Sequence, residues 1–283
     1  MTHDAADDAP EYVFDRTRTD EEERLAAQSE VVDPFSERLF RDAGLGSGMR
    51  VLELGSGAGD VAMLAARIVG AQGEVVGIEG SPLAIDTARR RADDAGLHNV
   101  SFLEGDLREL DTVIDESAPS FDALVGRFVL QFMPDPARVL RVAAGHLRPG
   151  GLVCFQECDD HYAAAYPSTP LWDQVHTWVL AALDFAGVET RMGLRLYQTF
   201  LAAGLAAPEL RLEAGIGGGE QAPAFAWADV LRSVIPTLER AGIATEAEID
   251  PDSLEDRLMQ ETAATDGIVI TIVLVGASSR TSA

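Results

Sequence analysis

Residues 51–60 read Val51-Leu52-Glu53-Leu54-Gly55-Ser56-Gly57-Ala58-Gly59-Asp60. A short apolar run leads into a turn with glycine at every second position, and an amphipathic stretch follows at once. This order predicts a strand, a tight loop and the start of a helix. Glycine lets a ligand lie against bare backbone, and the first turn of a helix offers free N–H groups with a partial positive charge. The stretch therefore predicts a binding site for a small polar ligand.

The spacing of the glycines separates two classes of cofactor. A dinucleotide fingerprint has the order G-x-G-x-x-G, whereas here Gly55, Gly57 and Gly59 are followed by Asp60. A carboxylate at that point would face a pyrophosphate at the helix start and repel it. The pattern E-x-G-x-G-x-G instead resembles motif I of the class I S-adenosylmethionine (SAM) dependent methyltransferases. SAM carries no phosphate, so it tolerates the acid.

A second acid ends the next predicted strand. Residues 74–79 form a run rich in valine and isoleucine that finishes at Glu79. A carboxylate at this strand tip can accept hydrogen bonds from both ribose hydroxyls, and each hydrogen bond to a charged group is worth about 1.5–3 kcal/mol. Ser81 and Pro82 suit the N-cap and the first position of the following helix. Both a nicotinamide cofactor and SAM would use an acid here, so Glu79 indicates an adenosine without choosing between them.

Later residues strengthen the resemblance to the methyltransferase family. Gly105, Asp106 and Leu107 follow the third predicted strand. The resemblance implies that Asp106 accepts a hydrogen bond from the adenine amino group and that the Leu107 backbone N–H meets a ring nitrogen. It also implies that the strand ending at Arg127 approaches the methionine moiety of SAM. Across residues 45–160 the chain resembles small-molecule methyltransferases of the ubiquinone- and menaquinone-biosynthesis type.

The cofactor site that this resemblance implies draws on several strand tips and on the N-terminal region. Its ligands would be SAM and the product S-adenosylhomocysteine. The expected cofactor-binding residues are Gly55, Ser56, Gly57, Glu79, Gly80, Asp106, Leu107 and Arg127, with Tyr12 and Gln28 from the N-terminal region.

Alternating strand and helix patterns predict an α/β fold, because such alternation gives a parallel sheet covered by helices on both faces. We expect a doubly wound, seven-stranded, mostly parallel sheet of the Rossmann-like methyltransferase type. Strands are expected near residues 50–54, 74–79, 99–103, 122–126, 151–157, 209–216 and 268–275. The last strand should insert antiparallel beside the fifth.

Helices at both ends of the chain should complete this single domain. Residues 1–44 would form a tail and lid helices, broken near Asp33-Pro34; residues 45–160 would form the SAM-binding core. Residues 161–283 would supply the last two strands and a helical insertion between strands six and seven, which would act as a substrate cap.

Candidates for acid–base chemistry follow the fifth strand. A base is needed only when the accepting nucleophile carries a proton of high pKa. His161 is the expected base, because an unperturbed histidine pKa of about 6.5 suits neutral pH. Glu157 and Asp159 could orient a hydroxyl or stabilise positive charge on the substrate. Neighbouring residues of a strand point to opposite faces, which makes Asp159, Asp160 and His161 an awkward set of metal ligands, so no metal is expected.

The composition limits the classes of ligand and partner that the chain can be expected to bind. The chain has 283 residues and a formal net charge of −25, and all of its basic residues are arginine. The absence of lysine excludes a Schiff-base lysine and a Walker-type phosphate loop, and the acidity disfavours nucleic acid and anionic membranes. With no apolar run long enough for a membrane span and with Cys154 and Cys158 expected as reduced thiols, a cytoplasmic protein is predicted. Exchange of lid helices and cap between subunits would allow a homo-oligomer.

The predicted function is SAM-dependent methyl transfer to a small molecule, at oxygen first, with nitrogen or carbon as alternative acceptors. Two other classes stay open. An NAD(P)-dependent oxidoreductase is one, although Asp60 and the Gly105-Asp106 pair count against it. A non-catalytic SAM-binding protein, or a SAM-fold protein with altered chemistry such as cyclisation, is the other.

Overall fold

The computed structural model of the chain describes residues 21–114, 120–218 and 227–282. They fall into two compact units. The sheet unit comprises Val32–Glu157, Gly193–Leu212 and Val275–Ala283. The helical unit comprises Cys158–Met192, Glu213–Leu274 and, at the N-terminal side, the described residues 21–31.

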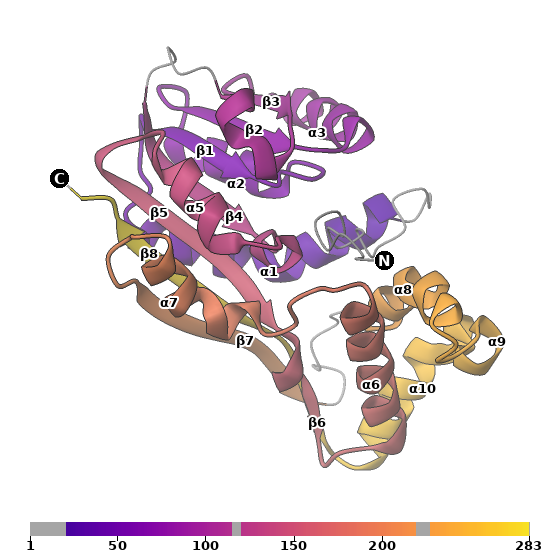
Figure 1. The fold of residues 1–283 in the computed structure, drawn as a ribbon. Helices are drawn as coiled ribbons and strands as arrows, with labels where there is room; N and C mark the ends of the chain where they lie inside the picture. Colours follow the sequence, from indigo (N-terminus) through magenta and orange to yellow (C-terminus); the bar gives the residue numbers. More distant parts are fainter. Residues whose placement is uncertain (1–20, 115–119, 219–226, 283) are drawn as a thin grey trace, which may run out of the picture. The chain divides into compact units, whose positions relative to one another are not determined.

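The first five strands alternate with helices, as the apolar runs predict. The strands are β1 (Arg50–Leu54), β2 (Glu74–Glu79), β3 (Val100–Glu104), β4 (Phe121–Arg127) and β5 (Leu147–Asp159). The helices between them are α2 (Asp60–Val69), α3 (Pro82–Asp94), α4 (Leu110–Val113) and α5 (Pro136–Ala144), with short 3₁₀ turns η1 (Leu107–Glu109) and η2 (Leu130–Phe132). These strands are parallel in the order β3-β2-β1-β4-β5 (Figure 1). The order reverses between β1 and β4, and ligands of such sheets bind beyond the carboxyl ends of the strands at this reversal.

Three further strands extend the sheet. Strand β8 (Ile268–Arg280) lies beside β5, while β6 (Ala164–Tyr166) and β7 (Glu209–Gly218) both pair with β8. The Gly150 N–H donates to the Ser282 carbonyl and the Thr281 N–H to the Gly151 carbonyl, so the start of β5 meets the end of β8, as in an antiparallel pair. The described residues therefore hold eight strands, and the predicted number of seven is wrong. Strand β6 was missed because a three-residue strand is too short to show an alternating pattern.

Helix α1 (Glu21–Ala43) is continuous, so the predicted break near Asp33-Pro34 is wrong. Pro34 lies inside the helix and has no N–H to donate to the Glu30 carbonyl. The neighbouring Val32 and Phe40 side chains are fully buried. Their burial compensates for one missing backbone hydrogen bond, because each buried apolar side chain of this size is worth about 1.5–3 kcal/mol.

The helical unit contains most of the remaining helices. They are η3 (Asp160–Tyr162), α6 (Pro170–Phe185), α8 (Trp227–Arg240), α9 (Glu246–Ile249) and α10 (Pro251–Ala264), and α7 (Met192–Ala202) begins at its edge. Helices α8 to α10 follow β7 and precede β8 in the chain, where the helical insertion was expected. The role of these helices as a substrate cap, and of α1 as a lid, stays a prediction. None of the described helices combines the length and apolar character needed to cross a bilayer.

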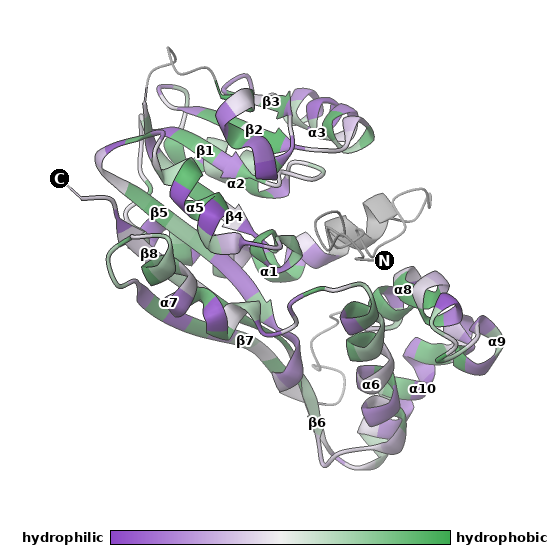
Figure 2. Ribbon diagram, in the orientation of Figure 1, coloured by the Kyte–Doolittle hydropathy of each residue, from purple (hydrophilic) through white to green (hydrophobic). Residues whose placement is uncertain are grey.

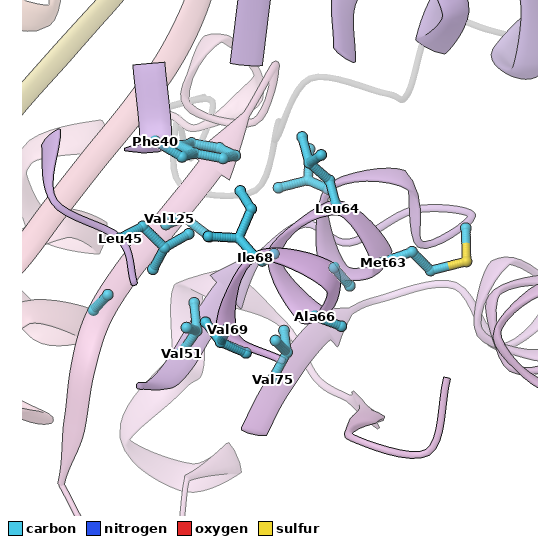
Figure 3. Packing of buried hydrophobic residues seen from close by; sticks show 14 of the residues in the cluster. Phe40, Leu45, Val51, Met63, Leu64, Ala66, Ile68, Val69, Val75 and Val125 are labelled. Atoms are coloured by element: carbon cyan, nitrogen blue, oxygen red, sulfur yellow. The ribbon is translucent and has the colours of Figure 1, made fainter. Parts of the chain in front are cut away.

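One hydrophobic core fixes the strands that carry the site. Val51 of β1, Val75 of β2 and Val125 of β4 point to the same face of the sheet, where Val69 of α2 and Phe40 of α1 pack on them (Figure 3). Helix α5 carries hydrophobic and hydrophilic residues together, as expected for a helix with one buried face (Figure 2). This packing holds the tips of β1, β2 and β4 in a fixed register.

Candidate functional site

The loop between β1 and α2 is the centre of the candidate site. Gly55 and Gly57 have φ values of +66° and +51°, a region that side-chain-bearing residues rarely adopt. A Cβ atom on Gly55 would lie 2.5 Å from Val129 Cγ2, so this glycine is required by packing. A Cβ atom on Gly57 would meet nothing within 4 Å. The Cβ side of Gly57 therefore faces open space, as expected of a ligand-binding turn.

Glu79 ties this loop to the tip of β2. Its side chain is 5% exposed, its Oε2 accepts a hydrogen bond from the Gly57 N–H at 2.9 Å, and its Oε1 accepts one from the Ser81 N–H at 2.9 Å. Ser81 Oγ in turn accepts from the Ala84 N–H as the N-cap of α3. The structure thus brings together Gly57 and Glu79, which the sequence placed at separate strand tips.

The tip of β3 joins the same corner. The Gly105 N–H donates to the Glu79 carbonyl at 3.0 Å, and Leu107 is buried with its Cδ1 3.9 Å from the Cβ position of Gly55. The Asp106 carboxylate is partly exposed and forms an ion pair with Arg108 at 2.5 Å. Hydrogen bonds from Arg108 lower the pKa of Asp106 below its ordinary value, so this group is an anion at neutral pH. Recognition of adenine by Asp106 stays a prediction.

Two buried polar atoms near the loop have no hydrogen-bond partner among the described residues, Glu53 Oε2 and Ser56 Oγ. Glu53 is 1% exposed at the end of β1. Burial raises its pKa well above the ordinary value; the nearby Arg127 opposes this shift, while Asp60 and Glu79 add to it. An unpartnered buried carboxyl is costly, and a ligand cation would relieve that cost. Glu53 begins the glycine motif, but no role was predicted for it; the signal that could have identified it is a lone acid inside the apolar run of β1.

The raised pKa of Glu53 predicts a pH-dependent cost to stability. Below the ordinary glutamate pKa both the folded and the unfolded chain hold the proton. As the pH rises above it, the unfolded chain ionises first, so stability is lost until the folded carboxyl also ionises. We expect the stability advantage of Glu53→Gln over the wild type to be larger at pH 8 than at pH 5. Urea unfolding at both pH values measures this difference, with the exposed Glu104→Gln as control; equal differences at both pH values would refute it.

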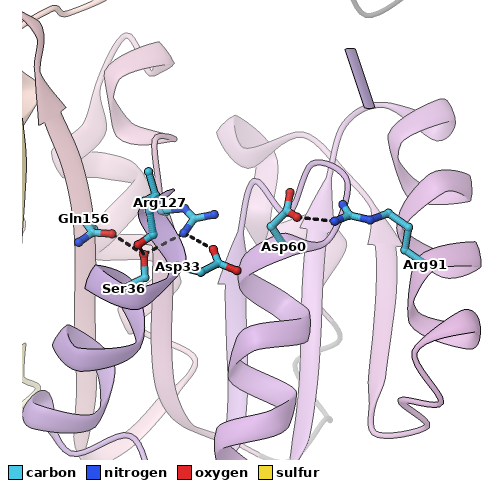
Figure 4. A network of polar contacts seen from close by, with 7 residues as sticks. Asp33, Ser36, Asp60, Arg91, Arg127 and Gln156 are labelled. Carbon is cyan, nitrogen blue, oxygen red and sulfur yellow. Dashed lines mark hydrogen bonds and ion pairs between the residues drawn. The ribbon is translucent and has the colours of Figure 1, made fainter. Parts of the chain in front are cut away.

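Arg127 connects β4 to α1 and β5 (Figure 4). Its Nη1 donates to Asp33 Oδ1 and to Ser36 Oγ, both at 2.8 Å, and the Ser36 hydroxyl donates to Gln156 Oε1 at 2.6 Å. The Arg127 side chain is 4% exposed and that of Asp33 29%. Burial raises the pKa of Asp33 although the attraction of Arg127 lowers it. The predicted cofactor residue Arg127 is therefore held by α1 in this structure.

Asp60 has a structural partner. Its Oδ1 forms an ion pair with Arg91 at 2.6 Å (Figure 4). Arg91 Nη1 also donates to the Ala58 carbonyl at 2.7 Å. Arg91 of α3 therefore fixes the end of the glycine loop and the first residue of α2. The acid that disfavours a pyrophosphate also anchors the loop.

Two residues of the predicted lid, Gln28 and Tyr12, were expected to bind the cofactor. Gln28 lies on α1 among the residues of the helical unit and is partly buried. Tyr12 lies outside the described residues.

The predicted catalytic residues occupy two environments. Glu157 is 0% exposed, and its Oε1 accepts hydrogen bonds from the Val129 and Leu130 N–H groups at 3.0 and 2.9 Å, which orders the turn after β4. Asp159, also fully buried, accepts from the His161 N–H at 3.2 Å. The His161 Nε2 atom lies 3.0 Å from Thr190 Oγ1. These contacts give each residue a local structural role, and their catalytic roles stay predictions.

Asp160 is a titratable group that the sequence analysis considered only as a metal ligand. Burial is the main cause that raises its pKa to about 7; a hydrogen bond from Cys158 opposes this shift, and the charge of the neighbouring Asp159 adds to it. The His176 Nε2 atom lies 2.7 Å from the backbone carbonyl oxygen of Asp160. Across the described residues, no group of three or more histidine, cysteine, aspartate and glutamate side chains is placed to hold a metal ion.

Comparison with known proteins supports the resemblance to the methyltransferase family. A family model described as a methyltransferase domain matches residues 45–189, about half of the chain. An arsenite methyltransferase from Aquipseudomonas alcaligenes is 37% identical over 114 residues, covering 39% of this chain and 33% of that protein. A demethylmenaquinone methyltransferase from Staphylococcus aureus is 29% identical over 142 residues, covering 50% and 54%. The chain thus spans a third to about half of the length of these relatives.

A solved structure extends the likeness to the whole fold. The YcgJ protein of Bacillus subtilis superposes with a TM-score of 0.53 at 17% identity, covering 92% of this chain and 99% of that one. At this identity the match supports the fold alone. Together with the family match, it confirms the Rossmann-like architecture and the resemblance on which the sequence analysis relied.

Proposed function

The chain belongs to the methyltransferase domain family, and from this premise we propose that it transfers a methyl group from SAM to a small-molecule acceptor. One observation carries the proposal. The Glu79 carboxylate, at the strand tip where a ribose would bind, is hydrogen bonded to the Gly57 N–H of the open glycine turn. The two features that an adenosine needs therefore form one site.

The remaining groups fit the rest of SAM. The cofactor, when bound, supplies a methyl group activated by a sulfonium charge. The buried Glu53 carboxyl, with Oε2 unpartnered, suits the ammonium of the methionine end, and Arg127 suits its carboxylate. Glu79 would hold the ribose hydroxyls, and Asp106 with Leu107 the adenine edge. The site thus offers an acid to the ammonium and a cation to the carboxylate.

The acceptor is less constrained than the cofactor. We propose an oxygen acceptor first, with nitrogen and carbon as alternatives, and the named relatives act on acceptors as different as arsenite and demethylmenaquinone. Much of the rate of such an in-line transfer comes from positioning, which can contribute about 7–11 kcal/mol. A strong base is therefore not a requirement of the proposal.

Calorimetric titration with SAM, S-adenosylhomocysteine and NAD tests the cofactor. We expect both SAM and S-adenosylhomocysteine to bind and NAD to bind far more weakly, because Asp60 stands where a pyrophosphate would lie. Tighter binding of NAD would favour the oxidoreductase alternative. Cofactor binding without methyl transfer to any of a panel of phenols, amines and activated carbon acids would favour the non-catalytic alternative.

His161 provides a separate test of the acid–base assignment. His161→Ala should slow turnover about 10²-fold or more if the imidazole is the base, while SAM affinity stays unchanged. Asp160→Asn, at the neighbouring titratable group, is the matched variant for the pH–rate profile. Full activity of His161→Ala together with loss of the pH dependence near pH 7 in Asp160→Asn would transfer the role to Asp160.

A further inference from the structure

The cation at the methionine end of the proposed site is already paired. Leu54 and Gly126 are register partners, so the next residues, Gly55 and Arg127, follow them at the adjacent tips of β1 and β4. At this point the Arg127 guanidinium is bound by the Asp33 carboxylate, which comes from α1. Nothing in the sheet requires an acid from α1 at this position. The pairing therefore calls for a reason other than sheet formation.

The charges around Arg127 suggest that reason. Asp33 and Glu53 both lie close enough to Arg127 for its charge to affect them, whereas Asp60 forms its ion pair with Arg91. A ligand carboxylate that approaches the tip of β4 would meet the Arg127 guanidinium, and it would find there a carboxylate of the same charge and shape. Asp33 and Ser36 already take both N–H groups of Nη1, so a ligand carboxylate can bind this nitrogen only if Asp33 leaves it.

We propose that Asp33 occupies, on Arg127, the place of the carboxylate at the methionine end of the cofactor, so that α1 and the cofactor compete for one guanidinium. The inference rests on the proposed function. Ser36, the second α1 group on Arg127, keeps its hydrogen bond to Gln156 and can stay in place when Asp33 leaves.

Helix α1 is built to yield at this point. Pro34 follows Asp33 directly and removes the backbone hydrogen bond to Glu30. Residues 21–31 of α1 belong to the helical unit, and its residues from Val32 onward belong to the sheet unit. Displacement of Asp33 would therefore loosen the helix where it passes from one unit to the other. Binding of the cofactor would then lower the local stability of α1 at this point.

The test compares Asp33→Asn with the wild type by calorimetry, using S-adenosylhomocysteine and 5′-methylthioadenosine, which lacks the amino-acid end. Without the competing carboxylate, S-adenosylhomocysteine should bind about 5-fold more tightly, while the affinity for 5′-methylthioadenosine stays unchanged. The matched control is Asp42→Asn on the same helix, whose carboxylate pairs with Arg211. This control should change neither affinity. Unchanged or weaker binding of S-adenosylhomocysteine by Asp33→Asn would overturn the inference.

Hydrogen exchange of the wild-type protein provides a measurement that needs no variant. Addition of S-adenosylhomocysteine should speed exchange in α1 around residues 30–36, and addition of 5′-methylthioadenosine should not. Protection of these amides by S-adenosylhomocysteine would also overturn the inference. Failure of the wild type to bind either compound would remove the proposed function as well, whereas binding without these differences removes the competition alone.

Discussion

Glu79→Ala is expected to weaken SAM binding by about 100-fold or more. The variant would lack the proposed hydrogen bonds from the carboxylate to both ribose hydroxyls, each worth about 1.5–3 kcal/mol. It would also lose its contacts with the Gly57 and Ser81 N–H groups, so the glycine turn would no longer be fixed against β2. Calorimetric titration with SAM measures the change, and thermal unfolding of the variant shows whether the fold is kept.

Glu104→Ala is the matched control for this variant. Glu104 is the register partner of Glu79 at the tip of β3, and its side chain is exposed. It should leave SAM affinity within about twofold of the wild type, since exposed surface substitutions rarely exceed ±0.5 kcal/mol. Equal affinities of the Glu79 and Glu104 variants would place the ribose elsewhere.

Arg127→Met should lower the free energy of unfolding by about 3 kcal/mol. The substitution keeps the unbranched stem of the side chain but removes the guanidinium, so it leaves Asp33 without its partner and removes the charge that offsets the buried Glu53. Removing one partner of a buried ion pair costs about 3–5 kcal/mol. The lower end applies because Asp33 is 29% exposed and can take up a proton. Calorimetry should show a fall in Tm of roughly 6 °C or more.

Two comparisons isolate the buried pair. Arg148→Met removes an arginine that pairs with Asp122 at the surface, where ion pairs contribute about 0–1 kcal/mol, so its Tm should fall far less. The double variant Arg127→Met with Asp33→Asn should recover part of the lost stability, because the stranded carboxylate is then gone. If Arg127→Met were no more damaging than Arg148→Met, the pair would not stabilise the fold.

The sequence predicts the strand tips and the loop well because these depend on local patterns. The apolar runs of β1 to β5, the glycine turn and the acid of Glu79 are each set by a few consecutive residues. Parallel strands then bring their carboxyl ends to one edge, which is why Gly57 and Glu79 could be expected to meet before their hydrogen bond was seen.

The parts that could not be predicted depend on burial or on distant pairing. Arg127 and Asp33 lie 94 residues apart, and no local pattern links them. The sequence shows that Glu53 and Glu157 are acids but not that both are fully enclosed, one with an unsatisfied oxygen and the other accepting two backbone N–H groups. Pro34 led to the wrong prediction of a helix end. The burial of its neighbours, which compensates for the missing hydrogen bond, is a tertiary effect that the local sequence does not show.

Arg91 has one more consequence, for the thermodynamics of ligand capture. Because its side chain binds both the Ala58 carbonyl and the Asp60 carboxylate, it immobilises the turn before any ligand arrives. The entropy of ordering this turn is thus lost during folding instead of during association, which leaves more of the contact energy as affinity. Association at this turn should therefore behave as docking onto a preorganised surface, limited by diffusion and orientation more than by rearrangement of the turn.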